Sequence, residues 1–124
     1  MIAYVTLGTN DLQRAGRFYD ELLAILGAKR IWEAERSVGW GTGPQSPAVS
    51  VIKPYDGQRA TAGNGTMVAL AAGSTALVDS VYRKALELGA QDEGPAGPRG
   101  SGFYVGYFRD LDGNKLAVFC AGGS

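Results

Sequence analysis

The two halves of the chain repeat one order of expected elements, and this repeat limits the possible folds more than any other feature. The tripeptide Leu-Gly-Ala occurs at residues 26–28 and again at 88–90, an offset of 62 residues in a chain of 124. In each half a short strand-like segment precedes an amphipathic helical pattern that ends at a glycine, Gly27 or Gly89. Such repetition indicates a fold built from two copies of one unit.

In the first half, residues 2–8 are rich in β-branched and aromatic types and predict a strand. Asn10 or Asp11 is expected to cap the helix that follows, with Gln13 placed as a capping-box partner of Asn10. One apolar helical face is formed by Leu12, Ala15, Phe18, Tyr19, Leu22, Leu23 and Leu26. Three short strands are then predicted, at residues 28–33, 36–41 and 48–53. A connector rich in turn residues follows at 54–65.

The pattern restarts in the second half. Residues 66–72 predict a strand, Ser74 is a candidate N-cap, and apolar residues at helical spacing run to Gly89. The segment 95–102 is expected to be irregular because it is rich in proline and glycine. Two further strands, 103–109 and 115–120, form a predicted hairpin.

These elements indicate an α+β fold of two βαβββ modules, about 1–57 and 63–124, within a single domain. Side by side, the modules would form a half-open, barrel-like curved sheet with the helices outside. The concave inner surface is then the expected ligand site. Alternation along the first strand places Tyr4 on this concave side, because the alternate positions are all apolar and suit the helix-packed side.

Composition narrows the possible functions. The chain has no histidine, which excludes histidine-based catalysis and histidine-ligated metal sites. It has one cysteine, which excludes an internal disulfide. Twelve basic residues balance twelve acidic ones, which argues against nucleic acid or a membrane surface as a partner. The sequence shows neither a signal peptide nor a membrane span, so a cytoplasmic protein is expected.

Several segments resemble the glyoxalase/bleomycin-resistance/extradiol-dioxygenase family, the vicinal oxygen chelate superfamily. The resemblance covers nearly the whole chain and agrees with the repeat read from the residues. The segments that carry it are residues 3–12 (AYVTLGTNDL), 17–20 (RFYD), 63–65 (GNG) and 108–115 (FRDLDGNK).

Enzymes of this family bind a divalent metal through His and Glu side chains on the inner sheet faces. The resemblance places those positions at Tyr4, Met67, Ala117 and at or near Ser50. A phenol has an ordinary pKa of about 10, and a thioether prefers soft metals, so these side chains suit a hard dication poorly. Neither a metal nor another cofactor is therefore predicted, and metal-dependent glyoxalase or dioxygenase activity is not expected.

The same positions become candidates for binding a small molecule. Tyr4 would either donate a hydrogen bond to a ligand or fill space, and Met67 would either contact the ligand or fill a gap. Arg99 would either clamp a carboxylate or phosphate or remain a solvated loop residue. Aromatic residues on the strands suit a flat ligand, although about half of them should face the helices. The full candidate set is Tyr4, Trp40, Ser50, Met67, Arg99, Tyr107 and Ala117.

Three functions remain open from the sequence. The first is a metal-independent protein that binds a small, partly apolar or aromatic ligand, similar to family members that sequester antibiotics. The second is a lyase, isomerase or dioxygenase-related enzyme that works without the metal. The third is an inactive relative whose role is dimerisation. A homodimer is expected, because the sheets would otherwise keep exposed edges.

Overall fold

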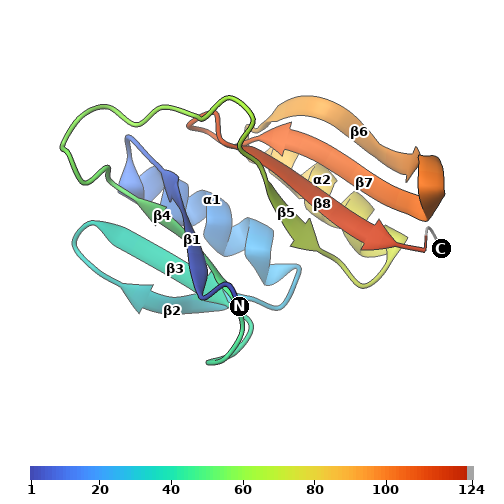
Figure 1. Ribbon diagram of the computed structural model, residues 1–124, viewed down its shortest axis with the longest axis horizontal. Coiled ribbons are helices and arrows are strands. Elements are labelled where there is room, and N and C mark those ends of the chain that lie inside the picture. Colours follow the sequence, from blue (N-terminus) through green and yellow to red (C-terminus); the bar gives the residue numbers. More distant parts are fainter. Residues whose placement is uncertain (123–124) are drawn as a thin grey trace. The chain divides into compact units, whose positions relative to one another are not determined.

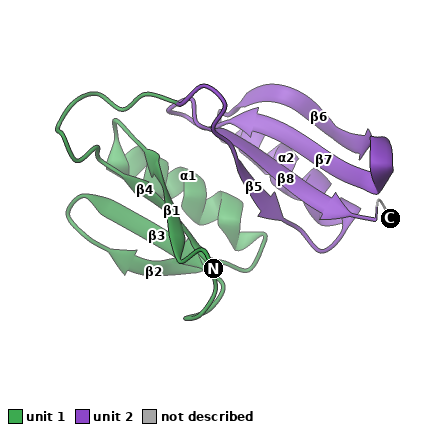
Figure 2. Cartoon of the chain, in the orientation of Figure 1, with its two compact units in different colours: residues 1–62 green, residues 63–124 purple. Residues whose placement is uncertain are grey.

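Each half of the chain folds into a four-stranded sheet with one helix packed on one face. The computed structural model describes residues 1–122, and the chain divides into two compact units, unit 1 over residues 1–62 and unit 2 from Gly63 onward (Figure 2). The division falls close to the predicted module boundary. Both sheets are open and neither is a closed barrel, which confirms the α+β expectation (Figure 1).

Unit 1 has the strand order β1-β4-β3-β2. Strand β1 runs parallel to β4, and the other neighbours are antiparallel. Helix α1 packs against β2, β3 and β4. The elements of unit 1 are β1 (Tyr4–Gly8), α1 (Leu12–Ala24), β2 (Lys29–Glu33), β3 (Ser37–Gly41) and β4 (Ala48–Ile52).

Unit 2 has the equivalent strand order β5-β8-β7-β6, with β5 parallel to β8. Helix α2 packs against β6, β7 and β8. Its elements are β5 (Val68–Ala71), α2 (Thr75–Glu87), β6 (Gln91–Arg99), a 3₁₀ turn (Gly100–Gly102), β7 (Phe103–Arg109) and β8 (Lys115–Ala121). Helices α1 and α2 each have 13 residues, as expected for two copies of one unit.

The helix ends follow from local side-chain chemistry. Asp11 caps α1 by accepting a hydrogen bond from the Arg14 amide, and Ser74 caps α2 in the same way. Gly27 and Gly89 follow the two helices with φ angles of 82° and 103°, in the left-handed region that glycine adopts without strain. Asn10 does not form the expected capping box. Its side-chain amide instead exchanges two hydrogen bonds with the backbone of Ala60 in the connector.

The segment 95–102 corrects one sequence expectation. It was expected to be irregular, but β6 continues through Arg99 before the 3₁₀ turn begins. Strand β6 lies at the edge of its sheet, and its register with β7 shifts twice, between Asp92 and Gly94 and between Gly94 and Gly97. Proline is tolerated in an edge strand because its missing N–H need not face a neighbouring strand.

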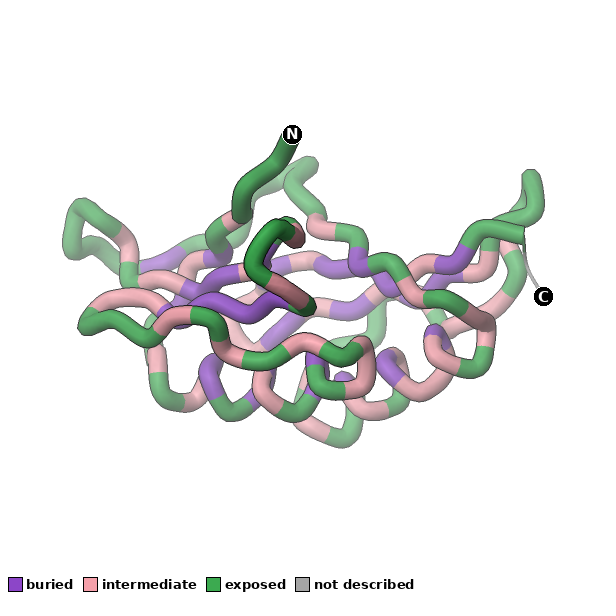
Figure 3. The backbone as a smooth tube through the Cα atoms, turned by 90° about the horizontal axis from the view of Figure 1, so that it is seen from below, coloured by how far each residue is buried: buried purple, intermediate pink, exposed green. Residues whose placement is uncertain are grey.

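Each core lies between the helix and its own sheet, and buried positions recur along the strands and on one side of each helix (Figure 3). In unit 1, the Asp20 carboxylate of α1 accepts hydrogen bonds from Arg30 on β2 and from the indole of Trp40 on β3. In unit 2, Asp79 of α2 accepts one from Tyr104. No helix in the described part of the chain has the length and apolarity needed to cross a membrane.

Candidate ligand-binding site

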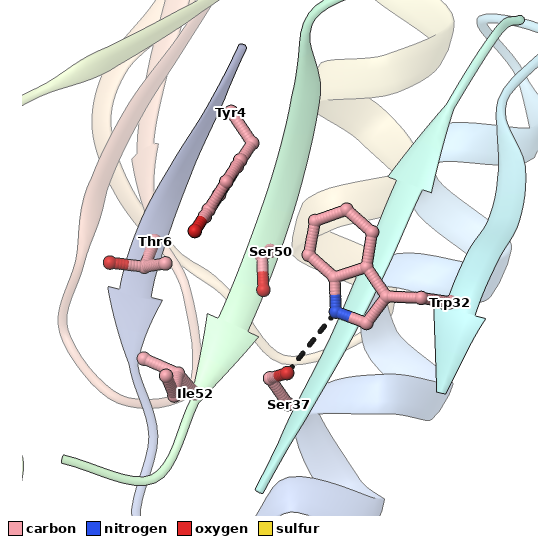
Figure 4. Close-up of a pocket in the computed structure, with 6 residues that line it drawn as sticks. All are labelled: Tyr4, Thr6, Trp32, Ser37, Ser50 and Ile52. Carbon is pink, nitrogen blue, oxygen red and sulfur yellow. Dashed lines mark hydrogen bonds between the residues drawn. The ribbon is translucent and has the colours of Figure 1, made fainter. Parts of the chain in front are cut away.

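Unit 1 has a pocket of about 330 Å³ lined by side chains from all four strands of its sheet (Figure 4). The lining residues are Tyr4, Thr6, Trp32, Ser37, Ser50 and Ile52. Strand pairing explains why they meet. Thr6 lies opposite Ser50, Ser50 lies opposite Gly39, and Gly39 lies opposite Trp32, so these residues form a row across one face of the sheet.

Two aromatic rings flank this pocket. The rings of Tyr4 and Trp32 are 5.4 Å apart between centroids, and their planes meet at 76°, an edge-to-face arrangement. The Trp32 indole donates a hydrogen bond of 3.1 Å to the Ser37 hydroxyl, which fixes its orientation. Tyr4 is 56% exposed, so its ring is largely available to a ligand.

Gly39 allows the Trp32 indole to lie over β3. A Cβ atom at this position would come within 2.5 Å of the Trp32 ring, closer than any real side chain allows. The glycine is therefore needed for space beneath the ring.

The polar groups of the pocket are uncharged hydroxyls. Ser50 is fully buried, and its hydroxyl donates to the Val51 carbonyl at 3.3 Å, a long hydrogen bond. Thr6, Ser37 and Tyr4 supply three more hydroxyl groups. Among the described residues that line this pocket, none carries a carboxylate, an ammonium or a guanidinium group. The pocket thus suits a flat, mostly apolar group that can accept or donate a few hydrogen bonds.

Two of the residues predicted from sequence, Tyr4 and Ser50, lie together in this pocket. Trp40 lies on the helix side of the same sheet. It is 1% exposed, its ring is 5.5 Å from that of Tyr19 in α1, and its indole N–H bonds to Asp20. Of the two tryptophans on strands, Trp32 therefore faces the pocket and Trp40 faces the helix. This agrees with the expectation that about half of the strand aromatics face the helices.

The remaining predicted residues belong to unit 2. Tyr107 and Ala117 are direct cross-strand partners, so they share one face of its sheet. Met67 is exposed and immediately precedes β5. Arg99 ends β6, with its guanidinium 5.8 Å from the centre of the Tyr107 ring.

Sequence reasoning did not select three lining residues, Thr6, Trp32 and Ser37. Thr6 follows Tyr4 by two positions, and strand alternation already placed it on the same face. Predicting that Trp32 lines the pocket would require knowing that it pairs with Gly39. Alternation does not give this pairing, because the β2–β3 register shifts between Arg30 and Trp32. The register shift arises only when the two strands pair, so the sequence of either strand alone does not reveal it.

Comparison with known proteins decides the family. The model of the Glyoxalase/Bleomycin resistance protein/Dioxygenase superfamily matches residues 1–118. This chain belongs to the glyoxalase/bleomycin resistance protein/dioxygenase superfamily. A search of curated proteins gives no match.

Solved structures of the superfamily agree with this assignment. A glyoxalase/bleomycin resistance protein from Albidiferax ferrireducens T118 is 31% identical, with a TM-score of 0.89 over 97% of this chain and 98% of that one. A lactoylglutathione lyase from Agrobacterium tumefaciens is 23% identical, with a TM-score of 0.69 over 97% and 92%. A superfamily enzyme from Burkholderia phytofirmans PsJN is 16% identical, with a TM-score of 0.77 over 96% and 97%. The last two likenesses show the fold alone.

The residues that the sequence resemblance places at the superfamily's metal positions offer a poor set of donors for a hard divalent cation. The Ala117 side chain has no donor atom, Met67 offers only a thioether, and Ser50 offers a single neutral hydroxyl. Tyr4 offers a phenol whose ring lies edge to face with the Trp32 indole. Within residues 1–122, no three His, Cys, Asp or Glu side chains gather where they could hold a metal ion.

Proposed function

We propose that this chain binds a small, flat, partly apolar ligand in the unit 1 pocket, in the cytoplasm and without the superfamily's divalent metal. The observation that carries the proposal is the Tyr4–Trp32 pair, two aromatic side chains held edge to face beside a buried serine. Aromatic surfaces stack on flat ligands, and a few fixed hydroxyls set the ligand's orientation.

The uncharged lining favours a neutral ligand. A charged ligand group placed here would lose hydration without gaining an ion pair from the lining residues, which is costly. The aromatic part of the ligand would lie against Trp32, and its polar atoms would meet Ser50 or Tyr4.

The chemistry of the lining also favours binding over turnover. A lyase or isomerase that works without a metal needs a group that takes up and releases a proton. The described lining residues include no carboxylate, imidazole, thiol or amine, and their one acidic group beyond simple alcohols is the phenol of Tyr4. One exposed phenol, with no charged partner lining the pocket, supports capture of a ligand better than an acid–base reaction.

A thermal-shift screen of neutral bicyclic aromatic compounds, run with EDTA, tests this proposal. A compound present at about 100 times its Kd adds about 2.7 kcal/mol to the free energy of unfolding, which raises Tm by a few degrees. We expect this shift in the wild-type protein and in Tyr55→Ala, because Tyr55 is 91% exposed and does not line the pocket. Tyr4→Ala should lose it. An equal shift in Tyr4→Ala, or a shift only when a divalent metal is added, would overturn the proposal.

A further inference from the structure

In unit 2, two cations lie close to the same aromatic ring. The guanidinium carbon of Arg99 is 5.8 Å from the centre of the Tyr107 ring, and the ammonium nitrogen of Lys115 is 5.4 Å from the same centre. The two cations come from the strands on either side of β7, Arg99 from β6 and Lys115 from β8 (Figure 1). Two positively charged side chains are therefore close to one ring in a chain with no net charge.

The Arg99 side chain is held in place by its own strand. It donates hydrogen bonds to the carbonyl oxygens of Pro95, Gly97 and Pro98, at 2.7, 3.1 and 3.3 Å. A Cβ atom at Gly94 would come within 3.1 Å of the Tyr107 ring and 3.6 Å of the Arg99 guanidinium. Glycine at this position leaves room for the ring and the guanidinium to approach each other.

Both cations retain donors for a ligand. A guanidinium has five N–H groups, and the three hydrogen bonds of Arg99 leave two unused. Within residues 1–122, the Lys115 ammonium has no hydrogen bond or ion pair, so it keeps three donors. Neutral carbonyls hold Arg99 without cancelling its charge.

The neighbouring carboxylates of β6 are engaged elsewhere. Asp92 accepts hydrogen bonds from the Tyr82 hydroxyl and from the Gly94 amide. Glu93 pairs with Arg109 at 3.2 Å. Across the strand from Tyr107 lies Ala117, whose methyl group offers no acceptor. In the described part of the chain, neither of these β6 carboxylates forms a hydrogen bond or ion pair with Arg99 or Lys115.

We propose that unit 2 carries an oxyanion-binding site formed by Arg99, Lys115 and the Tyr107 hydroxyl. Its ligand group is a carboxylate or a phosphate, which accepts charge-assisted hydrogen bonds from both cations. Fixing Arg99 against the ring beforehand reduces the side-chain entropy that binding would otherwise cost. The site lies within unit 2 and does not depend on the unit 1 pocket.

The test follows the backbone amide signals of the ¹⁵N-labelled full chain by NMR during titration with sodium phosphate or sodium acetate. Sodium chloride at equal ionic strength is the salt control. We expect saturable shifts within β6, β7 and the start of β8 for at least one of the two anions and none for chloride. A response to phosphate alone would assign a phosphate ligand, and a response to acetate alone a carboxylate ligand.

Lys115→Gln removes one charge and should raise the Kd about tenfold, the loss expected for one charge-assisted hydrogen bond. Lys29→Gln is the matched control, because Lys29 is an exposed strand lysine of unit 1. Its Kd should stay within about twofold of wild type. The proposal is wrong if neither anion gives saturable shifts, or if the two variants weaken binding equally.

Discussion

At the level of single residues, the pocket depends on the Tyr4–Trp32 pair and on the glycine beneath it. Tyr4 offers both a ring and a hydroxyl, and these two contributions can be separated. We expect Tyr4→Ala to weaken ligand binding by about 1–2 kcal/mol, the scale of a lost aromatic contact or hydrogen bond. Tyr4→Phe should lose less, because it keeps the ring contact with Trp32. Isothermal titration of both variants measures the difference. Equal losses would assign the whole effect to the hydroxyl.

Gly39→Ala should displace the Trp32 indole, because the added methyl would lie 2.5 Å from the ring. Overpacking of this kind destabilises a fold by about 1–3 kcal/mol, and here it should also abolish binding in the pocket. Gly43→Ala is the control, since the nearest atom to its new Cβ would be 3.7 Å away. Urea unfolding and ligand titration report the two effects separately. Wild-type affinity in Gly39→Ala would contradict the assigned role of Trp32.

Residue identity alone did not separate the two tryptophans. Alternation along residues 2–8 was sufficient to place Tyr4 on the face away from α1, because the alternate positions are all apolar. Trp32 and Trp40 lie on adjacent strands, and their facing depends on the shifted β2–β3 register. The Trp40 indole N–H donates to Asp20, a partner 20 residues away in sequence that only the folded unit brings close.

At the level of elements, Asp20 ties α1 to two strands of its sheet. Its carboxylate accepts hydrogen bonds from Arg30 at 2.8 and 2.9 Å and from Trp40 at 2.8 Å. The Arg30 hydrogen bond holds the pKa of Asp20 below its ordinary value of 3.8, against the opposing effect of burial, with the Trp40 hydrogen bond helping to lower it. The ionised carboxylate therefore adds to the stability of the docked helix.

Asp20→Asn should lower the free energy of unfolding by about 1 kcal/mol, because the ion pair is partly exposed. The lowered pKa means that the carboxylate stabilises the folded state fully above pH 3.8, and that this stability is lost as the pH falls through the folded pKa. Denaturant unfolding at pH 7 and in steps below pH 4 measures the free energy of unfolding of both proteins. Between pH 7 and the acid range, Asp20→Asn should lose less of this free energy than wild type. Glu33→Gln, which removes a more exposed carboxylate from the same Arg30, should change stability by less than about 0.5 kcal/mol.

Strand β6 shows where element prediction from sequence fails. Local composition in residues 95–102 indicated irregular structure, and only the pairing with β7 makes most of this segment a strand. Pro95 and Pro98 fit into β6 because this strand lies at the edge of its sheet and its register with β7 shifts twice. By contrast, the helices were predicted well, because capping residues and terminal glycines are local signals.

At the scale of the whole molecule, the repeat of 62 residues was enough to predict two similar units, and the structure contains them. How the chain assembles is a separate question. We expect a homodimer, because four-stranded open sheets leave edge strands that a second copy can cover. Light scattering at micromolar protein should give about twice the chain mass of 13.0 kDa. A mass near 13 kDa would contradict this expectation.

The composition of the whole chain also predicts its metal content. Protein purified without a tag should carry less than one Ni, Zn, Fe or Mn per chain, because the chain has no histidine and Ala117 stands at a ligand position of the superfamily. Elemental analysis measures this directly. One tightly bound transition metal per chain, removable by chelator only with loss of structure, would contradict it.

The most direct test of the proposed pocket uses the only two tryptophans of the chain, one in the pocket and one in the core. Protein labelled with 5-fluorotryptophan should give two ¹⁹F resonances, assigned with Trp32→Phe. Titration in EDTA with the aromatic compound that most raises Tm should shift the Trp32 resonance saturably and leave the Trp40 resonance in place. A shift of Trp40 with Trp32 unmoved, or no shift of either at a concentration that raises Tm, would show that the ligand binds elsewhere.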